Sequence, residues 1–416
     1  MATITFGTAL KDSAWLEDFY NVDTLKLVSK TATKAVYRDA DGDQIVLTGK
    51  SFSFSGDFAK EGTVTGAVFT AGSGDKYLTF SDGSFKASEV FAEIKDKAFF
   101  NLLTRLTAGK DVINGTGNGE DIIIGRNGGN DTIRGKGGDD YIKGGPGSKV
   151  MDGGSGWDTL SYDESYWDQA NATKGIVLNA AKGTVSNSWG GTDRIKNFEA
   201  YRGSHLADKI VGSDKDEGFM GLAGIDTLDG GKGWDEVMYH RDQRFGGKKG
   251  IAVDLAESKI KDGFGNIDTV KNIEAVFGTF YADTFKGDAK GNQFRGLGGK
   301  DSFDGGKGSD TLAFHWWEDV GQHGATVDLR KTTNNVIDDG FGNTETAKSI
   351  ENLEGTDFND KFIFGKSDGY AYGRGGNDRL VAGAGANRLE GGQGADRFVF
   401  LKATDSAKGT TTRDFI

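Results

Sequence analysis

The sequence predicts an all-β protein in which a small β-rich domain precedes a long region of short strands and tight turns. Glycine accounts for 67 of the 416 residues whereas proline occurs once, and this pairing fits many tight turns between hydrogen-bonded strands. Of these glycines, 57 follow residue 110. The same part of the chain is repetitive with a period of nine residues, which indicates a stacked architecture.

Charge is distributed as unevenly as glycine. The formal net charge is −12, and residues 1–110 hold 13 basic and 14 acidic residues, so the remaining chain carries a net charge of −11. An acidic chain is a poor partner for nucleic acid or for an anionic membrane. No run of 18 apolar residues occurs, so we expect no transmembrane segment. The absence of cysteine excludes a disulfide scaffold and a cysteine nucleophile.

Residues 1–108 predict the β-rich domain, which ends in an amphipathic helix. From 88 to 106 the apolar residues lie mostly on one helical face, and we expect this helix to lead into the repeats and cover their open end. The acidic cluster at 39–43 resembles an EF-hand loop only superficially, because its twelfth position is Lys50; a hairpin tip is the better interpretation. Strand-like alternation marks 35–47, 52–55, 63–69 and 76–80.

Residues 109–416 contain the nine-residue repeat in four blocks. In the stretch that begins at Gly153, Gly-Gly-Ser-Gly-Trp-Asp-Thr-Leu-Ser, a glycine-rich turn precedes an acid at the sixth place and an aliphatic residue at the eighth. The last acids of three blocks, Asp158, Asp235 and Asp310, are 77 and 75 residues apart, so the nonapeptides sit inside a larger repeat. The blocks span about 111–161, 203–238, 278–313 and 355–400.

Related inserts separate the blocks, at about 162–202, 239–277 and 314–354. They either extend the same coil as longer rungs or form separate lobes. We favour longer rungs, because we expect Ile195, Ile273 and Ile350 to share one phase of the larger repeat.

The spacing of the acids indicates calcium binding. Two nonapeptides make one full coil, so turns on the same side are about 18 residues apart and their acids form stacked pairs. Glycine lets the backbone carbonyls of a turn point at one place, and hard oxygen ligands in a flexible cage suit Ca²⁺ better than Mg²⁺. The candidate calcium ligands are Asp121, Asp131, Asp140, Asp158, Asp208, Glu217, Asp226, Asp235, Asp283, Asp301, Asp310, Asp360, Asp378 and Asp396.

Some sixth places hold no acid. Lys149 should not coordinate a cation; its ammonium either replaces a Ca²⁺ near Asp131 or leaves that turn empty. Asn292, Gly369 and Asn387 supply less charge, so we expect weaker sites there. The alternative is a glycine-rich solenoid that needs no metal, but such a solenoid has no reason to align carboxylates at one phase.

The arrays of Gly-Gly-x-Gly-x-Asp-x-(aliphatic)-x resemble the RTX (repeats-in-toxin), haemolysin-type calcium-binding repeat. The resemblance implies a parallel β-roll that binds several Ca²⁺ ions between its turns. It also implies type I secretion machinery for the full-length parent, without a cleaved leader, and calcium-driven folding in the extracellular space. The stretch from Gly394 resembles the start of the serralysin-type C-terminal module, without its protease: the His-Glu-x-x-His motif is absent.

These observations favour a secreted, non-enzymatic protein with an adhesion, matrix or polysaccharide-binding role, whose partner would be a bacterial or host surface polysaccharide or protein. The alternative is an extracellular polysaccharide-modifying enzyme that carries an RTX module, although no catalytic residues can be chosen because paired carboxylates occur throughout. A pore-forming toxin is disfavoured. Aromatic residues near the block ends, such as Trp157, Trp234 and Trp316, either cap the rolls or stack on sugar rings.

Overall fold

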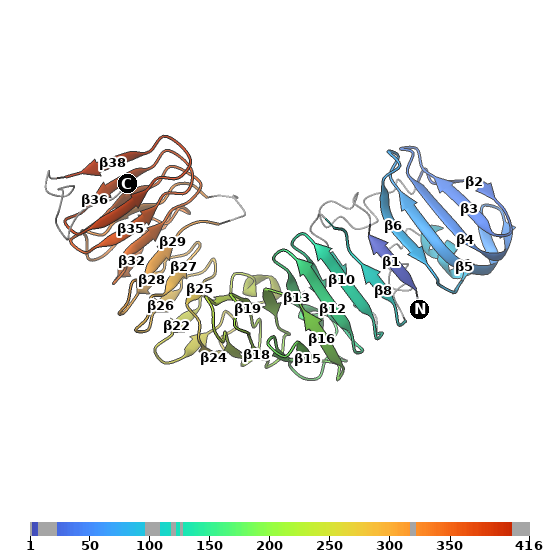
Figure 1. The fold of residues 1–416 in the computed structure, drawn as a ribbon, viewed down its shortest axis with the longest axis horizontal. Coiled ribbons are helices and arrows are strands. Elements are labelled where there is room, and N and C mark those ends of the chain that lie inside the picture. Colours follow the sequence, from blue (N-terminus) through green and yellow to red (C-terminus); the bar gives the residue numbers. More distant parts are fainter. Residues whose placement is uncertain are drawn as a thin grey trace. The chain divides into compact units, whose positions relative to one another are not determined.

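The computed structural model describes residues 2–6, 23–95, 109–117, 122–124, 128–316 and 322–401 (Figure 1). The chain divides into two compact units, Met1–Ser204 and His205–Ile416. The first unit holds the N-terminal domain and the first repeat block, and the second holds the other three blocks. Strands predominate in both units, which confirms the predicted all-β class. The expected ligand Asp121 and the residues after 401 lie outside the described part of the chain.

The N-terminal domain is an antiparallel sheet. The residues at 39–43 form the tip of a hairpin, as predicted, because the Asp39 carboxylate accepts the backbone N–H groups of Asp41 and Asp43 at 3.0 and 2.9 Å. The strands are β2 (Lys26–Lys30), β3 (Lys34–Arg38), β4 (Gln44–Ser55), β5 (Phe58–Thr70), β6 (Lys76–Ser81) and β7 (Phe85–Lys86).

Helix α2 (Ala87–Lys95) packs on this sheet. Val90, Phe91 and Ile94 are buried, and the ring of Phe91 lies 5.7 Å from that of Tyr37 and 5.8 Å from that of Phe52. The predicted helix is therefore present at 87–95, and its described part completes the core of the N-terminal domain. Residues 96–106 of the expected helix lie outside the described residues.

A strand, and not the described helix, covers the first edge of the roll. Strand β1 (Thr3–Phe6) pairs antiparallel with β6 and parallel with β8 (Val112–Asn114), so Ile4 lies between Phe80 and Ile113. The backbone N–H of Ala2 also donates to the Asp111 carboxylate at 2.6 Å. An open sheet edge presents unpaired N–H and C=O groups that a strand can satisfy and a helix cannot.

The first roll consists of two parallel stacks of short strands that the chain visits alternately. The eighth-place residues Ile133, Ile142, Met151 and Leu160 are fully buried between the stacks. One stack contains β8, β10 (Thr132–Gly137), β12 (Val150–Ser155) and β16 (Thr192–Lys196); the other contains β9 (Ile122–Ile124), β11 (Tyr141–Lys143), β13 (Thr159–Ser161) and β17 (Ala200–Arg202).

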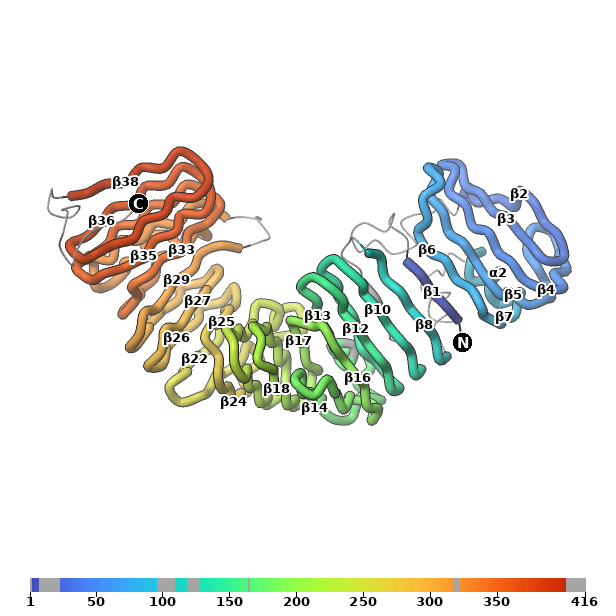
Figure 2. Tube along the Cα trace, in the orientation of Figure 1, coloured from blue at the N-terminus to red at the C-terminus, as the bar shows by residue number. Residues whose placement is uncertain are grey.

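The second unit repeats this arrangement over more rungs, and its successive coils can be followed in Figure 2. One stack contains β19 (Gly218–Met220), β21 (Glu236–Met238), β25 (Ala275–Phe277), β27 (Gln293–Arg295), β29 (Thr311–Ala313), β33 (Asn352–Glu354), β35 (Gly369–Tyr372) and β37 (Asn387–Glu390).

The facing strands of the second unit form separate groups. They are β18 (Lys209–Val211), β20 (Thr227–Asp229), β22 (Ala252–Asp254), β23 (Lys259–Lys261), β24 (Ile267–Lys271), β26 (Thr284–Lys286), β28 (Ser302–Asp304) and β32 (Thr346–Lys348), followed by β30 (Thr326–Asp328), β31 (Val336–Asp338), β34 (Lys361–Ile363), β36 (Arg379–Ala382) and β38 (Arg397–Phe400).

The inserts extend the coil, as favoured from the sequence. In the first insert, β14 (Val177–Asn179) and β15 (Thr184–Ser186) make an antiparallel excursion, after which β16 returns to pair with β12. The second insert returns in the same way, because β24 pairs with β20. The predicted common phase of the three isoleucines is wrong for Ile195. Ile195 pairs with Met151 in one stack, whereas the residue that corresponds to Ile273 in the first insert is Phe198, three residues later.

Substitution of Phe91 by Ala tests the packing of α2. We expect it to lower the free energy of unfolding of the N-terminal domain by about 3–5 kcal/mol, because a fully buried ring is removed. Urea unfolding followed by hydrogen exchange of the β4 and β5 amides measures the change. Lys60→Ala, at an exposed position of β5, is the control. Equal stability of the two variants would contradict this packing role.

Candidate metal centres

The sixth-place acids lie immediately before short strands and their side chains are withdrawn from solvent. Carboxylates are almost never buried to this extent unless they are paired. Asp396 is only partly buried. The other described acids of the predicted ligand set are at most 3% exposed: Asp131, Asp140, Asp158, Asp208, Glu217, Asp226, Asp235, Asp283, Asp301, Asp310, Asp360 and Asp378.

One carboxylate oxygen of each stacked pair has a backbone partner. Asp158 accepts the N–H of Asp140 at 2.8 Å, which stands 18 residues earlier in the chain. The described acids 18 residues apart therefore do lie side by side, as predicted. The contact joins the carboxylate of one acid to the backbone N–H of the other, and the two carboxylates do not bond each other. The same bond joins Asp208 to Asp226, Glu217 to Asp235, Asp283 to Asp301, Asn292 to Asp310, Asp360 to Asp378, and Asp378 to Asp396.

The second oxygen is buried without a hydrogen-bond donor in many of these acids. A buried carboxylate oxygen that lacks a donor or a cation carries a large desolvation cost. This orphan oxygen is the direct structural sign of a missing positive partner. It occurs as Oδ2 in Asp158, Asp226, Asp235, Asp301, Asp310 and Asp378.

Each orphan oxygen faces a glycine five residues earlier in the chain. A Cβ placed on Gly153 would lie 2.6 Å from Oδ2 of Asp158, and it would also collide with the carbonyl oxygen of Asn197. Gly230 is in the same relation to Asp235, at 2.5 Å. The space that only glycine leaves is thus lined by a carboxylate oxygen and a backbone carbonyl oxygen.

The carbonyls in these cradles come from left-handed residues in the inserts. Asn197, Asn272 and Ser349 have φ angles of 56°, 50° and 51°, and their carbonyl oxygens lie beside Gly153, Gly230 and Gly305. Left-handed backbone is uncommon outside glycine and often marks a functional position. Here it turns a carbonyl oxygen toward the sixth-place carboxylate.

The bonds from a backbone N–H to the carboxylate of the neighbouring rung form a series, called here the carboxylate ladder. Sequence reasoning missed the acids that continue this ladder through the inserts. Asp158 donates its N–H to Glu199 at 3.1 Å, and Asp235 and Asp310 donate to Glu274 and Glu351 at 3.2 and 3.0 Å. On the other stack the accepting acids are Asp193, Asp268 and Glu345. A signal was present, because Lys196-Asn-Phe-Glu, Lys271-Asn-Ile-Glu and Lys348-Ser-Ile-Glu recur at the period of the larger repeat.

The acids at the start of two blocks are satisfied without a metal. The Asp283 carboxylate accepts the N–H of Ile251 at 2.6 Å and both the N–H and the hydroxyl of Thr279, at 2.7 and 2.9 Å. Asp360 has the same three kinds of donor, with Ala325 and Thr356 as partners. These two predicted ligands therefore also fasten their own turns.

Burial and neighbouring acids raise the pKa of several carboxyls. Burial is the main cause for Asp235, whose pKa rises to about 7, and for Asp378, whose pKa rises to about 6. The pKa of the Asp226 carboxyl rises to about 10, because repulsion from Asp208 and Asp268 adds to the effect of burial. In metal-free protein, full ionisation of these groups opposes folding, and a bound cation reverses that penalty.

Carboxylates alone do not complete a cage. Among the residues that the structure describes, no three carboxylate or imidazole side chains converge on one point. The backbone carbonyl oxygens beside the glycine turns are candidates for further ligands. Oxygen donors of these two kinds fit Ca²⁺, which accepts six to eight of them in flexible geometry.

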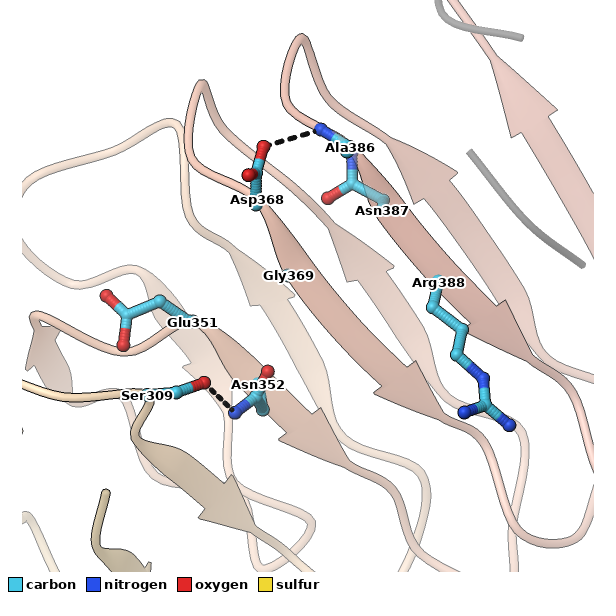
Figure 3. A pocket seen from close by; sticks show the side chains of 8 residues that line it. All are labelled: Ser309, Glu351, Asn352, Asp368, Gly369, Ala386, Asn387 and Arg388. Carbon is cyan, nitrogen blue, oxygen red and sulfur yellow. Dashed lines mark hydrogen bonds between the residues drawn. The ribbon is translucent and has the colours of Figure 1, made fainter. Parts of the chain in front are cut away.

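The turn at Gly369 illustrates a sixth place without an acid. Figure 3 shows a pocket around this glycine, lined also by Glu351 and Asn387. Asp368, one position earlier, accepts the N–H of Ala386 at 2.7 Å. The acid of this turn therefore stands one position before the sixth place, and its carboxylate bonds the backbone of a later turn.

The aromatic residues near the block ends divide into two groups. Tyr162 and Tyr239 are fully buried and Trp316 is 5% exposed, so these residues pack within their units. Trp157 and Trp234, in contrast, are 49% and 47% exposed. Each of the latter occupies the fifth place of a glycine turn. Trp317 lies outside the described residues.

A parallel coil with glycine turns and buried, unpartnered carboxylates defines a calcium-binding β-roll. Comparison with protein-family models matches the RTX calcium-binding nonapeptide repeat in four copies, at residues 126–160, 211–242, 277–312 and 372–402. The chain therefore carries four copies of the RTX repeat, and these repeats bind Ca²⁺ at several sites across the four blocks. No match was found among curated proteins. No helix in the described part of the chain is long and apolar enough to cross a membrane.

Substitution of Gly153 by Ala tests the cradle beside Asp158. The added methyl group would occupy the space between the carboxylate and the Asn197 carbonyl, so we expect one Ca²⁺ fewer per chain by native mass spectrometry. Gly117→Ala is the matched control, since nothing lies within 4 Å of its added Cβ. An unchanged ion count in Gly153→Ala would show that this space is not a calcium position.

Proposed function

We propose that this is a secreted protein whose rolls fold when they bind Ca²⁺ outside the cell. The observation that carries the proposal is the set of buried sixth-place oxygens that have no hydrogen-bond donor. A cation that binds only the folded roll adds its binding free energy to folding. Dissociation constants of 10⁻⁴–10⁻³ M, on the order known for extracellular calcium modules, suit a switch of this kind.

Three sites receive the strongest support. Asp158, Asp235 and Asp310 combine an orphan oxygen with a glycine cradle and an insert carbonyl. Calcium would supply the positive charge that these buried carboxylates lack. The remaining proposed ligands are Asp140, Asp208, Glu217, Asp226, Asp283, Asp301, Asp360, Asp378 and Asp396, with Asp121 proposed on sequence spacing alone and Asp131 set apart by its contact with Lys149.

Calcium titration of an EDTA-treated sample, followed by far-UV circular dichroism with Mg²⁺ as the control ion, tests this proposal. We expect a cooperative gain of β signal with Ca²⁺ only. Asp235→Asn should raise the calcium midpoint about tenfold, equivalent to roughly 1.4 kcal/mol. Asp214→Asn, which changes an acid that is 76% exposed, should leave it unchanged. A spectrum already folded in EDTA and unmoved by Ca²⁺ would contradict the proposal.

We further propose that the folded protein contacts surface or matrix polysaccharide. Trp157 and Trp234 support this role because exposed indole rings offer flat apolar faces to sugar rings. Their backbone N–H groups are held by Asp139 and Asp216, each at 2.7 Å. The two tryptophans therefore stand on fixed turns, which reduces the entropy lost on binding.

Replacement of both Trp157 and Trp234 by Ala should weaken binding to bacterial exopolysaccharide at least tenfold in a co-sedimentation assay with Ca²⁺ present. Ile225→Ala is the matched control, because Ile225 occupies the same place in its turn and is 65% exposed. Unchanged sedimentation of the double variant would rule out these rings as the contact. New reducing or unsaturated sugar ends in the same incubation would favour the polysaccharide-modifying enzyme instead.

A further inference from the structure

The sixth place of one turn in the first roll holds a buried lysine. The Lys149 side chain is fully buried, and its ammonium lies 3.2 Å from Oδ2 of Asp131. It also donates to the carbonyl oxygens of Gly129, at 3.0 Å, and Pro146, at 2.6 Å. The ammonium is thus surrounded by one carboxylate and two backbone carbonyls, which are the ligand types that the other turns offer to Ca²⁺.

The larger repeat supplies two counterparts of this turn within the same chain. The residues that correspond to Lys149 are Asp226, which lies 77 residues later, and Asp301, which lies 75 residues after Asp226. All three donate their backbone N–H to an insert acid: Lys149 to Asp193 at 2.7 Å, Asp226 to Asp268 at 2.9 Å, and Asp301 to Glu345 at 3.3 Å.

The three turns share a left-handed glycine at the fourth place. Gly147, Gly224 and Gly299 have φ angles of 95°, 133° and 136° and lie against the carbonyls of Gly129, Leu206 and Tyr281. The second place differs, because Leu222 and Leu297 are left-handed, with φ angles of 68° and 66°, whereas Gly145, which precedes Pro146, is not. The lysine turn therefore keeps the fourth-place contact of its counterparts, while its second-place conformation differs and its side-chain charge is reversed.

The first insert also has a residue without negative charge where the other inserts have an acid. Asn187 stands where the other inserts have Asp262 and Asp339. Its side-chain amide donates to Oδ2 of Asp193 at 3.1 Å and to the Gly147 carbonyl at 2.8 Å. The first of the larger repeats thus has Lys149 and Asn187 where the other two have acids. In the second of the larger repeats the corresponding acids, Asp226 and Asp262, repel each other.

We infer that the Lys149 ammonium permanently occupies the cation position of this turn, so the rung formed by β10 and β12 folds without calcium. The inference rests on the proposed function in one respect, namely that the corresponding turns at Asp226 and Asp301 require Ca²⁺. The calcium-independent rung is also the one that adjoins the N-terminal sheet, because β10 pairs with β8 and β8 pairs with β1.

Hydrogen exchange of the full chain, compared in EDTA and in Ca²⁺, tests the inference without any mutation. Peptides that cover β10 and β12 should be protected under both conditions, whereas those that cover β20 and β28, which follow Asp226 and Asp301, should be protected only with Ca²⁺. If β10 and β12 lose protection in EDTA together with the others, the inference is wrong while the proposed function stands. If β20 and β28 are already protected in EDTA, the proposed function fails.

The double variant Lys149→Asp/Asn187→Asp restores the acids of the other copies. We expect it to lose EDTA protection of β10 and β12 and to bind one additional Ca²⁺ by native mass spectrometry. Lys174→Asp/Ala181→Asp, which makes the same change of three charge units at exposed positions of the same unit, is the control. An unchanged ion count with retained EDTA protection would overturn the inference.

Lys149→Met serves as a second variant in case the double variant does not fold in Ca²⁺. It keeps an unbranched side chain, one atom shorter and without charge, and so leaves Asp131 without its cation. We expect it to lose EDTA protection of β10 and β12 without gaining an ion. Retained protection would show that the ammonium does not hold this rung together.

Discussion

The structure depends on the neutralisation of carboxylates that the coil itself buries. Most repeats place an acid directly before a strand, and the backbone of the neighbouring rung bonds one of its oxygens, as between Asp140 and Asp158. The other oxygen remains in a space of low polarity where a hydrogen-bond donor is missing. Because burying an unpaired charge costs several kcal/mol, the coil requires a positive partner at these places. Glycine supplies the room for it, and carbonyl oxygens complete its surroundings.

The turns meet this requirement in three different ways. At Asp235 the second oxygen lacks a donor, which leaves the position to a metal ion. At Asp283 the Thr279 backbone and hydroxyl already satisfy the carboxylate, so the acid stabilises its own turn. At Asp131 a lysine side chain provides the charge. The nonapeptide motif alone treats these acids as equivalent, but the residues that surround them divide the chain into segments of unequal calcium dependence.

The period of nine residues was sufficient to predict the short strands and the stacking of acids 18 residues apart, because these features repeat with the sequence. Three features do not follow from the nine-residue period. Strand β1 pairs with β8 across more than a hundred residues, and Ala2 bonds Asp111, a non-local contact that leaves no periodic trace. Glu199 lies outside a glycine turn, so it was not recognised as part of the ladder. The left-handed Asn197 was equally hidden, since its role depends on backbone conformation.

The position of the lysine within the first unit has a consequence for how a roll assembles. In a solenoid each rung is stabilised by its own interactions and by the rung beside it, so order spreads from whichever rung is already folded. The β10–β12 rung has its cation covalently attached, and β8 and β1 connect it to a sheet with a packed aromatic core around Phe91. On this proposal, a Ca²⁺ ion at Asp158 would bind beside Gly153, which belongs to β12 and is already in place. The entropic cost of forming a first rung is met within the chain, and calcium is needed only to add the next one.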